Sequence, residues 1–221
     1  MINAKIIVKY LIFLVGLFFM GLGVGLVTKA NMGTSPISSL PYVLSMIFPI
    51  TFGQFTILLS FLFLIIQIII LRKDFQNKQY LQIFVGPFFG LFVDLGMFIF
   101  SFINPGFYVI KVITLLIGCV VLALGVYLQV YANVTMNSGE ALVKAIAQKT
   151  GIEFGLVKIL FDCTLVLSAV VISLTEFGTI KGIGAGTIIS AIIIGYIIKI
   201  FRSIFIYFNL ERRFAQYFAN T

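Results

Sequence analysis

The sequence contains no histidine and only two cysteines, Cys119 and Cys163, which lie far apart within apolar segments. Without these side chains a zinc or haem site has no ligands, and neither a Ser-His nor a Cys-His catalytic pair can form. Charged residues are also scarce: they make up 10% of the chain, whereas soluble domains carry about a quarter. We therefore expect no enzyme, no cofactor and no metal site.

Hydrophobic residues account for 61% of the 221 residues, and the mean hydropathy is +1.18. A helix that crosses a bilayer core of about 30 Å needs about 20 apolar residues. Uncharged runs of about this length recur at residues 10–28, 52–71, 112–132 and 182–198. No sizeable soluble domain is left over. The chain is predicted to be one all-α membrane domain, residues 1–221, with about six transmembrane helices.

The formal net charge of +8 comes from short clusters of Lys and Arg beside the apolar segments. Such clusters are typical of topology signals, so nucleic acid is not an expected partner. A basic tail at residues 207–221 is predicted to be cytoplasmic. The alternative role for the basic residues within 199–213 is contact with anionic lipid headgroups.

The sequence matches itself at an offset of 102 residues without a gap. This offset aligns Leu22-Gly23-Val24 with Leu124-Gly125-Val126, Ala30-Asn31 with Ala132-Asn133, and Phe52-Gly53 with Phe154-Gly155. Each copy is predicted to contain a long helix, an Ala-Asn turn, a short helix and two more long helices. Residues 8–103 form repeat 1 and residues 108–206 form repeat 2.

Three spans per copy is an odd number, so the second copy must enter the membrane from the opposite side, which predicts an inverted repeat. The positive charges agree with this arrangement. If both termini are cytoplasmic, eleven Lys and Arg residues fall on the cytoplasmic side, as the positive-inside rule requires. Only Lys29, Lys111 and Lys181 fall outside.

Two short helices are predicted at residues 36–48 and 138–147, each about half a span long at about 1.5 Å per residue. Ser35-Pro36 and Asn137-Ser138 are start signals in which a polar side chain caps the first turn, and Gly151 ends the second helix. These helices either lie flat at the membrane surface or enter it as re-entrant segments. Re-entrance is favoured because the first carries no charge, whereas an interfacial helix has a charged face.

Ten polar side chains in or beside the apolar segments form the candidate substrate or ion site. Asp94 is expected in the middle of the third span without a basic neighbour, so its partner is another helix, a bound cation or a proton. Asp162 follows Lys158 by four residues, which allows a local salt bridge instead of a ligand role; the first copy has Ser60 in its place. The other seven candidates are Asn31, Thr34, Ser35, Asn133, Asn137, Ser138 and Glu140.

Asn31 and Asn133 end the first helix of each copy. They are either turn formers that tolerate left-handed backbone or amides that line a vestibule where the copies meet. Glu140, which corresponds to Ser38, is expected to be ionised because it lies in the first turn of a helix. If the short helices are re-entrant, their N-terminal donors favour an anionic group, whereas the acids favour a cation or a proton.

Residues 29–44, Lys-Ala-Asn-Met-Gly-Thr-Ser-Pro-Ile-Ser-Ser-Leu-Pro-Tyr-Val-Leu, resemble the signature of the uncharacterised YczE/YitT-type membrane proteins, more specifically the YczE-like subgroup. The resemblance extends over nearly the whole chain, through residues 88–94, 157–162 and 186–191. It implies a bacterial inner-membrane protein and names no substrate. Relatives of this type often carry an acid just before the Gly-Thr of the last helix, where this chain has Ala185.

The repeat, the paired short helices and the intramembrane acids predict a small secondary transporter for an unidentified solute, with its site between the short helices at the repeat interface. Two other functions stay open: a non-transporting membrane subunit or assembly factor, and the substrate-binding subunit of a larger uptake complex. Membrane lipids and the solute are the expected partners, and a homodimer is a further option.

Overall fold

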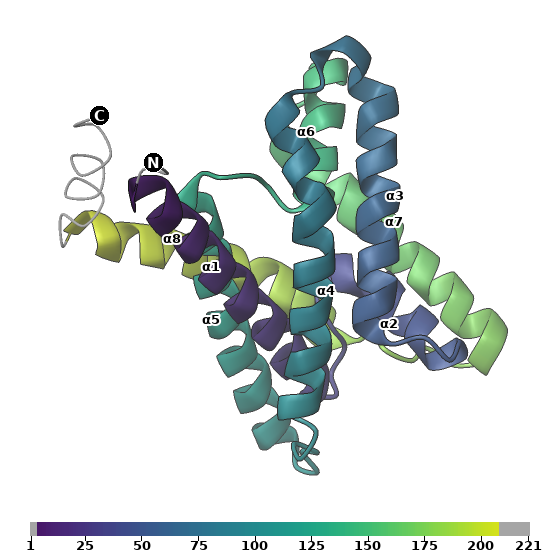
Figure 1. The fold of residues 1–221 in the computed structure, drawn as a ribbon. Coiled ribbons are helices and arrows are strands. Elements are labelled where there is room, and N and C mark those ends of the chain that lie inside the picture. The colour runs from purple at the N-terminus through teal and green to yellow at the C-terminus, as the bar shows by residue number, and fades with distance from the viewer. Residues whose placement is uncertain (1–3, 208–221) are drawn as a thin grey trace.

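The computed structural model describes residues 4–207, with side chains from residue 6 onward, and this part of the chain folds into α-helices without a strand (Figure 1). The predicted basic tail, apart from Tyr207, lies outside the described residues. Two short 3-10 segments, Arg72–Asp74 and Asn77–Leu81, connect the third and fourth helices. The helices are α1 (Ala4–Lys29), α2 (Pro36–Ile47), α3 (Phe52–Leu71), α4 (Gln82–Ile99), α5 (Tyr108–Ala132), α6 (Ser138–Thr150), α7 (Phe154–Phe177) and α8 (Ala185–Tyr207).

Six of these helices, α1, α3, α4, α5, α7 and α8, are long and apolar enough to cross a membrane. The other two, α2 and α6, are the predicted short helices. The expected all-α membrane fold with six spans is therefore confirmed. The predicted ends of the short helices need correction, because these helices end at Ile47 and Thr150. Helix α6 ends only where Gly151 adopts φ 72°.

The order of helices is the same in the two halves of the chain, and the helix starts follow the 102-residue offset closely. Helix α2 begins at Pro36 and α6 at Ser138, while α3 begins at Phe52 and α7 at Phe154. Positions related by this offset are called equivalent below. Equivalent residues Asn31 and Asn133 both have positive φ, 55° and 49°, which Asn tolerates better than most residues. Their role as turn formers is confirmed.

Helices α1 and α5 pack against each other along much of their length, and glycines let their backbones approach closely. A Cβ atom on Gly23 would overlap the backbone of Leu122, and one on Gly125 would lie 2.5 Å from the Met20 nitrogen. Gly23 is equivalent to Gly125, and Met20 is equivalent to Leu122, so the same contact occurs twice. Going from Met20 to Gly23 on α1, the contacted residue on α5 changes from Gly125 to Leu122. The two helices therefore run antiparallel.

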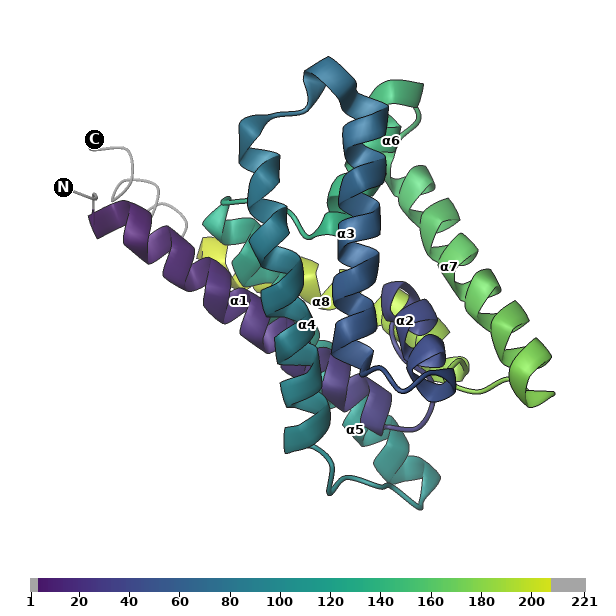
Figure 2. The ribbon, with the colours of Figure 1, turned by 45° about the vertical axis from the view of Figure 1, so that its right-hand side comes forward.

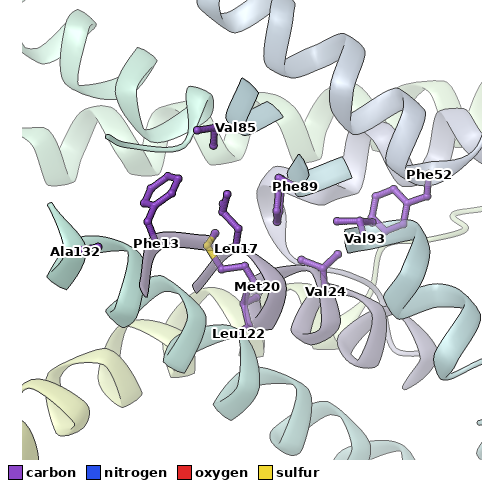
Figure 3. Close-up of a cluster of buried hydrophobic side chains, with 10 residues drawn as sticks. All are labelled: Phe13, Leu17, Met20, Val24, Phe52, Val85, Phe89, Val93, Leu122 and Ala132. Carbon is purple, nitrogen blue, oxygen red and sulfur yellow. The ribbon is translucent and has the colours of Figure 1, made fainter. Parts of the chain in front are cut away.

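The main hydrophobic core surrounds α1 (Figure 3). Buried residues make up 61% of the apolar window in α1 but only 6% in α8, so α1 is central and α8 peripheral. The core side chains come from α1, α3, α4 and α5. They are Phe13, Leu17, Met20, Val24, Phe52, Val85, Phe89, Val93, Leu122 and Ala132.

The two halves differ in how their last two helices pack. Helix α4 lies against α3, where a Cβ on Gly90 would come within 2.5 Å of the Gly53 carbonyl oxygen and where Gly86 lies against α3 as well. The equivalent residues on α8 are Ile188 and Ile192, which are 67% and 57% exposed. Helix α7 makes almost no contact with α8, which packs against α5 instead (Figure 2).

Candidate functional site

The polar side chains at the start of α2 satisfy one another. The hydroxyl oxygens of Thr28 and Thr34 are 2.9 Å apart, and the Ser35 hydroxyl donates to the Ser38 hydroxyl oxygen at 2.8 Å. All four side chains are buried. The expectation that the Ser35 hydroxyl caps α2 is wrong, because this hydroxyl is engaged with Ser38 instead. Thr34 and Ser35 thus belong to a closed hydroxyl cluster.

The start of α6 is less fully satisfied. The Asn137 side chain accepts a hydrogen bond from the Ser138 nitrogen at 2.8 Å, and Gln67 on α3 donates to the Ser138 carbonyl oxygen at 3.0 Å. Ser138 is fully buried, yet its hydroxyl has no hydrogen-bond partner among the described residues. A buried unpaired hydroxyl is costly, so the start of α6 carries a hydrogen-bonding group that the described residues do not use.

Sequence reasoning missed three buried glutamines. The side-chain amides of Gln67 and Gln82 exchange two hydrogen bonds of 3.1 Å between α3 and α4. Gln129 on α5 is buried, and neither of its amide atoms has a partner in the part of the chain that the structure describes. An amide inside or beside an apolar run is the signal that identifies such residues, because it is costly to bury unpaired.

The first turns of α2 and α6 meet inside the molecule. The Ile37 side chain lies directly against Gly139, where a Cβ would overlap it, and Phe63 of α3 lies next to them. Ile37 and Gly139 are equivalent positions. A position that touches its own equivalent lies where the two copies join, so Ser35 and Ser138, one or two residues earlier, flank this junction from the two copies.

Lys158 and Asp162 form the local ion pair that their spacing allowed. The Lys158 ammonium lies 2.6 Å from the Asp162 carboxylate, and the two side chains are 28% and 21% exposed. Glu140 on α6 lies near both: burial raises the pKa of its carboxyl, Lys158 lowers that pKa and Asp162 raises it. The helix dipole, which favours the ionised form, and burial, which opposes it, act in opposite directions on Glu140.

Asp94 lies near the end of α4, which ends at Ile99, and not in the middle of the span as expected. Its carboxylate accepts hydrogen bonds from the Thr51 hydroxyl at 2.6 Å and from the Gly53 nitrogen at 2.7 Å. Both donors belong to the start of α3, where a negative charge is favoured by the unpaired N–H groups and the helix dipole. The sequence left three partners open for Asp94: another helix, a bound cation or a proton. The structure shows the first of these, because Asp94 bonds to the start of α3.

Asn31 lines a cavity of about 430 Å³ between the end of α1, α2 and the segment before α8, together with Tyr42 and Lys181. A second hollow of about 480 Å³ is lined by Lys144 and Gln148 of α6, among others. Lys144 is equivalent to Tyr42 and Gln148 to Met46, so the two hollows share two equivalent positions. Asn133 is exposed and lines neither of them.

The ten candidates thus separate into several places. Asn137, Ser138, Glu140, Lys158 and Asp162 gather around the start of α6 and its contact with α7, whereas Thr34 and Ser35 lie at the start of α2. Asp94 is apart from both, at the start of α3. Within residues 4–207, no three or more His, Cys, Asp or Glu residues lie together as metal ligands would.

Together these features define a multi-pass α-helical membrane protein whose polar residues lie in several places, among them the starts of α2 and α6. The chain belongs to the family of unknown function DUF6198, whose profile matches residues 7–203. Two relatives come from Bacillus subtilis (strain 168). The chain is 29% identical to "Uncharacterized protein YyaS" over 215 residues, which cover 94% of this chain and 96% of the relative.

It is also 26% identical to "Uncharacterized membrane protein YczE" over 198 residues, which cover 88% of this chain and 86% of that protein. The resemblance to the YczE-like proteins is therefore confirmed. No solved structure matches the chain.

Proposed function

We propose that the protein is a small secondary transporter of the bacterial inner membrane, with both termini in the cytoplasm, and that it carries out transport and not catalysis. The observation that carries the proposal is the meeting of the two short helices at Ile37 and Gly139. In transporters built from inverted repeats, the ends of broken helices line the substrate site at the repeat interface. The solute binds between the starts of α2 and α6.

An inverted arrangement of the two copies is supported by the packing of α1 on α5. The paired contacts of Gly23 with Leu122 and of Gly125 with Met20 are the same contact made twice, as expected around a two-fold axis. Because these helices are antiparallel, the axis is perpendicular to them and would lie in the membrane plane. The ion pair between Lys149 and Asp74 joins the last turn of α6 to the 3-10 segment after α3, and the charge distribution assigns both to the cytoplasmic side.

The positions of the short helices support re-entrance over an interfacial location. Helix α2 packs against α3 of its own copy and α7 of the other, and α6 packs against α7 and α3 in the corresponding way. Figure 2 shows α2 lying between α3 and α7. A helix held between two long apolar helices of different copies can respond to movement of one copy against the other, as alternating access requires.

The two hollows support transport as well. One lies beside Tyr42 and the other beside its equivalent, Lys144. If the copies are inverted, equivalent hollows face opposite sides of the membrane. Each would then serve as the vestibule on its own side, with the solute passing between the starts of the short helices.

A ligand-binding screen tests the proposal. Purified protein in lipid vesicles is heated with a broad panel of amino acids, organic acids, amines and sugars, and at least one solute class is expected to raise the unfolding temperature and to show flux. Ser138→Val should remove the effect, because it deletes the unpaired buried hydroxyl, whereas Thr175→Val on the exposed part of α7 should preserve it. Absence of stabilisation and flux across the panel would contradict transport.

One observation favours a second function, that of a non-transporting membrane subunit. Only 6% of the apolar window of α8 is buried within the chain, and α7 is almost unpaired with it, so a wide helical surface is free for a partner. Purification in a mild detergent distinguishes the two functions. A single partner recovered in a fixed ratio, without any solute effect, would favour the subunit.

A further inference from the structure

The cavity of about 430 Å³ at the end of α1, called the Asn31 cavity below, is lined by both copies of the repeat. The first copy contributes Asn31 with its neighbours at the end of α1 and two residues of α2, and the second contributes residues 180–185 at the start of α8. Its volume falls within the range of about 300–1,000 Å³ that is typical of small-molecule sites. The cavity is therefore large enough for a small solute.

Glycines bring the two copies into close contact beside this cavity. A Cβ on Gly184 would lie 2.6 Å from the Met32 carbonyl oxygen, and a Cβ on Gly182 would lie 3.0 Å from the Tyr42 ring. The Gly186 nitrogen also donates to the Met32 carbonyl oxygen at 2.8 Å. These contacts join the segment before α2 to the segment before α8, so both walls of the cavity are held by backbone packing.

The free polar groups that line the cavity are mainly hydrogen-bond donors. The Asn31 amide, the Tyr42 hydroxyl and the Lys181 ammonium make no hydrogen bond or ion pair with any described residue. The backbone nitrogens of Gly182 and Ile183 donate to no described residue either. An ammonium together with free N–H and O–H groups can satisfy the oxygens of a carboxylate, which is an acceptor only.

Lys181 is fixed beside the cavity by α7. Its backbone nitrogen donates to the Ser173 hydroxyl oxygen at 2.7 Å, and its ammonium lies 4.6 Å from the centre of the Phe177 ring. With both termini in the cytoplasm, this lysine lies on the outer side of the membrane, where the positive-inside rule gives no reason for a positive charge. Topology therefore does not account for Lys181, whereas attraction of a negatively charged solute does.

The charges around the Asn31 cavity favour an anion. No aspartate or glutamate is among the described residues that line it. Lys29, in the last turn of α1, adds a second positive charge close by in the sequence. Of the acids nearest along the chain and in the packing, Asp94 is bound to the start of α3, and Glu176 is exposed and makes no ion pair with Lys181.

We propose that the Asn31 cavity binds a small organic anion through its carboxylate, with Lys181 as the counterion and with Asn31 and Tyr42 as hydrogen-bond donors. A neutral solute would leave the ammonium without a counterion, and a cation would be repelled by it. Binding forms and breaks no covalent bond. That the anion is also the transported solute rests on the function proposed above, whereas binding in this cavity does not.

Calorimetric titration of the whole protein in lipid nanodiscs tests the site, with lactate, succinate and benzoate as carboxylate probes. At least one probe is expected to bind, and its neutral amide analogue should bind about tenfold or more weakly, because it lacks the charge. Lys181→Gln should weaken binding by a similar factor, whereas Lys181→Arg should retain binding. Lys111→Gln, which removes another outer lysine that does not line the cavity, should bind the probe as the unmodified protein does.

A second variant keeps Lys181 in place. Asn31→Asp nearly preserves the size of the side chain, and Asp also tolerates positive φ, but the variant puts a carboxylate into the cavity and should lose binding. Its matched control is Asn133→Asp, at the equivalent position with φ 49°, which lines neither hollow and should bind normally.

The proposal is overturned if none of the three probes binds, if the amide analogue binds equally well, or if Lys181→Gln and Asn31→Asp keep the affinity of the unmodified protein. Flux is measured separately in lipid vesicles. Carboxylate binding without flux refutes only transport, whereas solute flux that is unchanged in Lys181→Gln and Asn31→Asp refutes only the anion site.

Discussion

At the scale of single residues, a carboxylate inside a membrane protein needs a partner, and the acids of this chain meet that need differently. Asp94 has the start of α3, Asp162 has Lys158, and Glu140 has neither an ion pair nor a hydrogen bond within the described chain. The spacing of Asp162 and Lys158 revealed their pair beforehand. The partners of Asp94 lie about forty residues away in sequence, so no local pattern could identify them.

Asp94→Asn tests the structural role of that acid. The variant keeps the shape of the side chain but loses the charge that strengthens its bonds to Thr51 and Gly53, so it should lose about 1–3 kcal/mol of unfolding free energy. Circular dichroism during heating in mild detergent measures the loss. The control is Asp74→Asn, at an exposed surface ion pair, and it should change little. If Asp94→Asn keeps full stability but abolishes solute binding, Asp94 belongs to the transport site instead.

Lys158→Met tests the ion pair. Removing the ammonium leaves two carboxylates together in a partly buried place, and we expect the variant to be destabilised by about 1–3 kcal/mol. The double variant Lys158→Met/Asp162→Leu should recover much of that loss, since it removes the stranded charge. Thermal unfolding of the two variants is compared with the unmodified protein. Absence of recovery would indicate that Asp162 has a role beyond pairing with Lys158.

At the scale of helices, glycine determines which neighbours pack closely. Glycines allow α1 to approach α5 and α4 to approach α3, whereas the equivalent positions on α8 are exposed isoleucines and α8 barely contacts α7. The positions of the glycines in the sequence do not identify the helices against which they pack. Gly184 and Gly186 illustrate this: they contact the backbone of Met32 between α1 and α2, and not another helix.

Gly23→Ala should destabilise the centre of the molecule. Its Cβ would overlap the backbone of Leu122, which cannot move aside as a side-chain end could, and overpacking of this kind costs about 1–3 kcal/mol. The matched control is Gly195→Ala, in α8, where nothing lies within 4 Å of the added carbon. The control should unfold at the same temperature or slightly higher. Equal melting of the two variants would contradict the α1–α5 packing.

At the scale of the whole molecule, the two halves of the chain have the same order of helices but differ in side chains and in packing. The helices recur in the same order with nearly the same offset, yet hydroxyls in one copy are replaced by charges in the other. The two copies also pack their last helices differently.

Cysteine labelling tests whether the copies are inverted. Lys78 and Ile180 are equivalent and both exposed, so an inverted repeat places them on opposite sides of the membrane. In a background without Cys119 and Cys163, Ile180→Cys should react with a membrane-impermeant maleimide in intact cells. Lys78→Cys should react only after the membrane is opened. Labelling of both from the same side would refute the inversion.

The sequence by itself determined the membrane class, the number of long helices, the repeat and the ends formed by Asn31 and Asn133. These depend on local composition and on backbone preferences, which are written in consecutive residues. Only the tertiary structure decided that Asp94 holds the start of α3 and that Gln67 of α3 bonds to Gln82 of α4. It also placed Ile37 against Gly139. The physical reason is that these contacts depend on which helices approach closely, and long-range packing, not spacing along the chain, sets that approach.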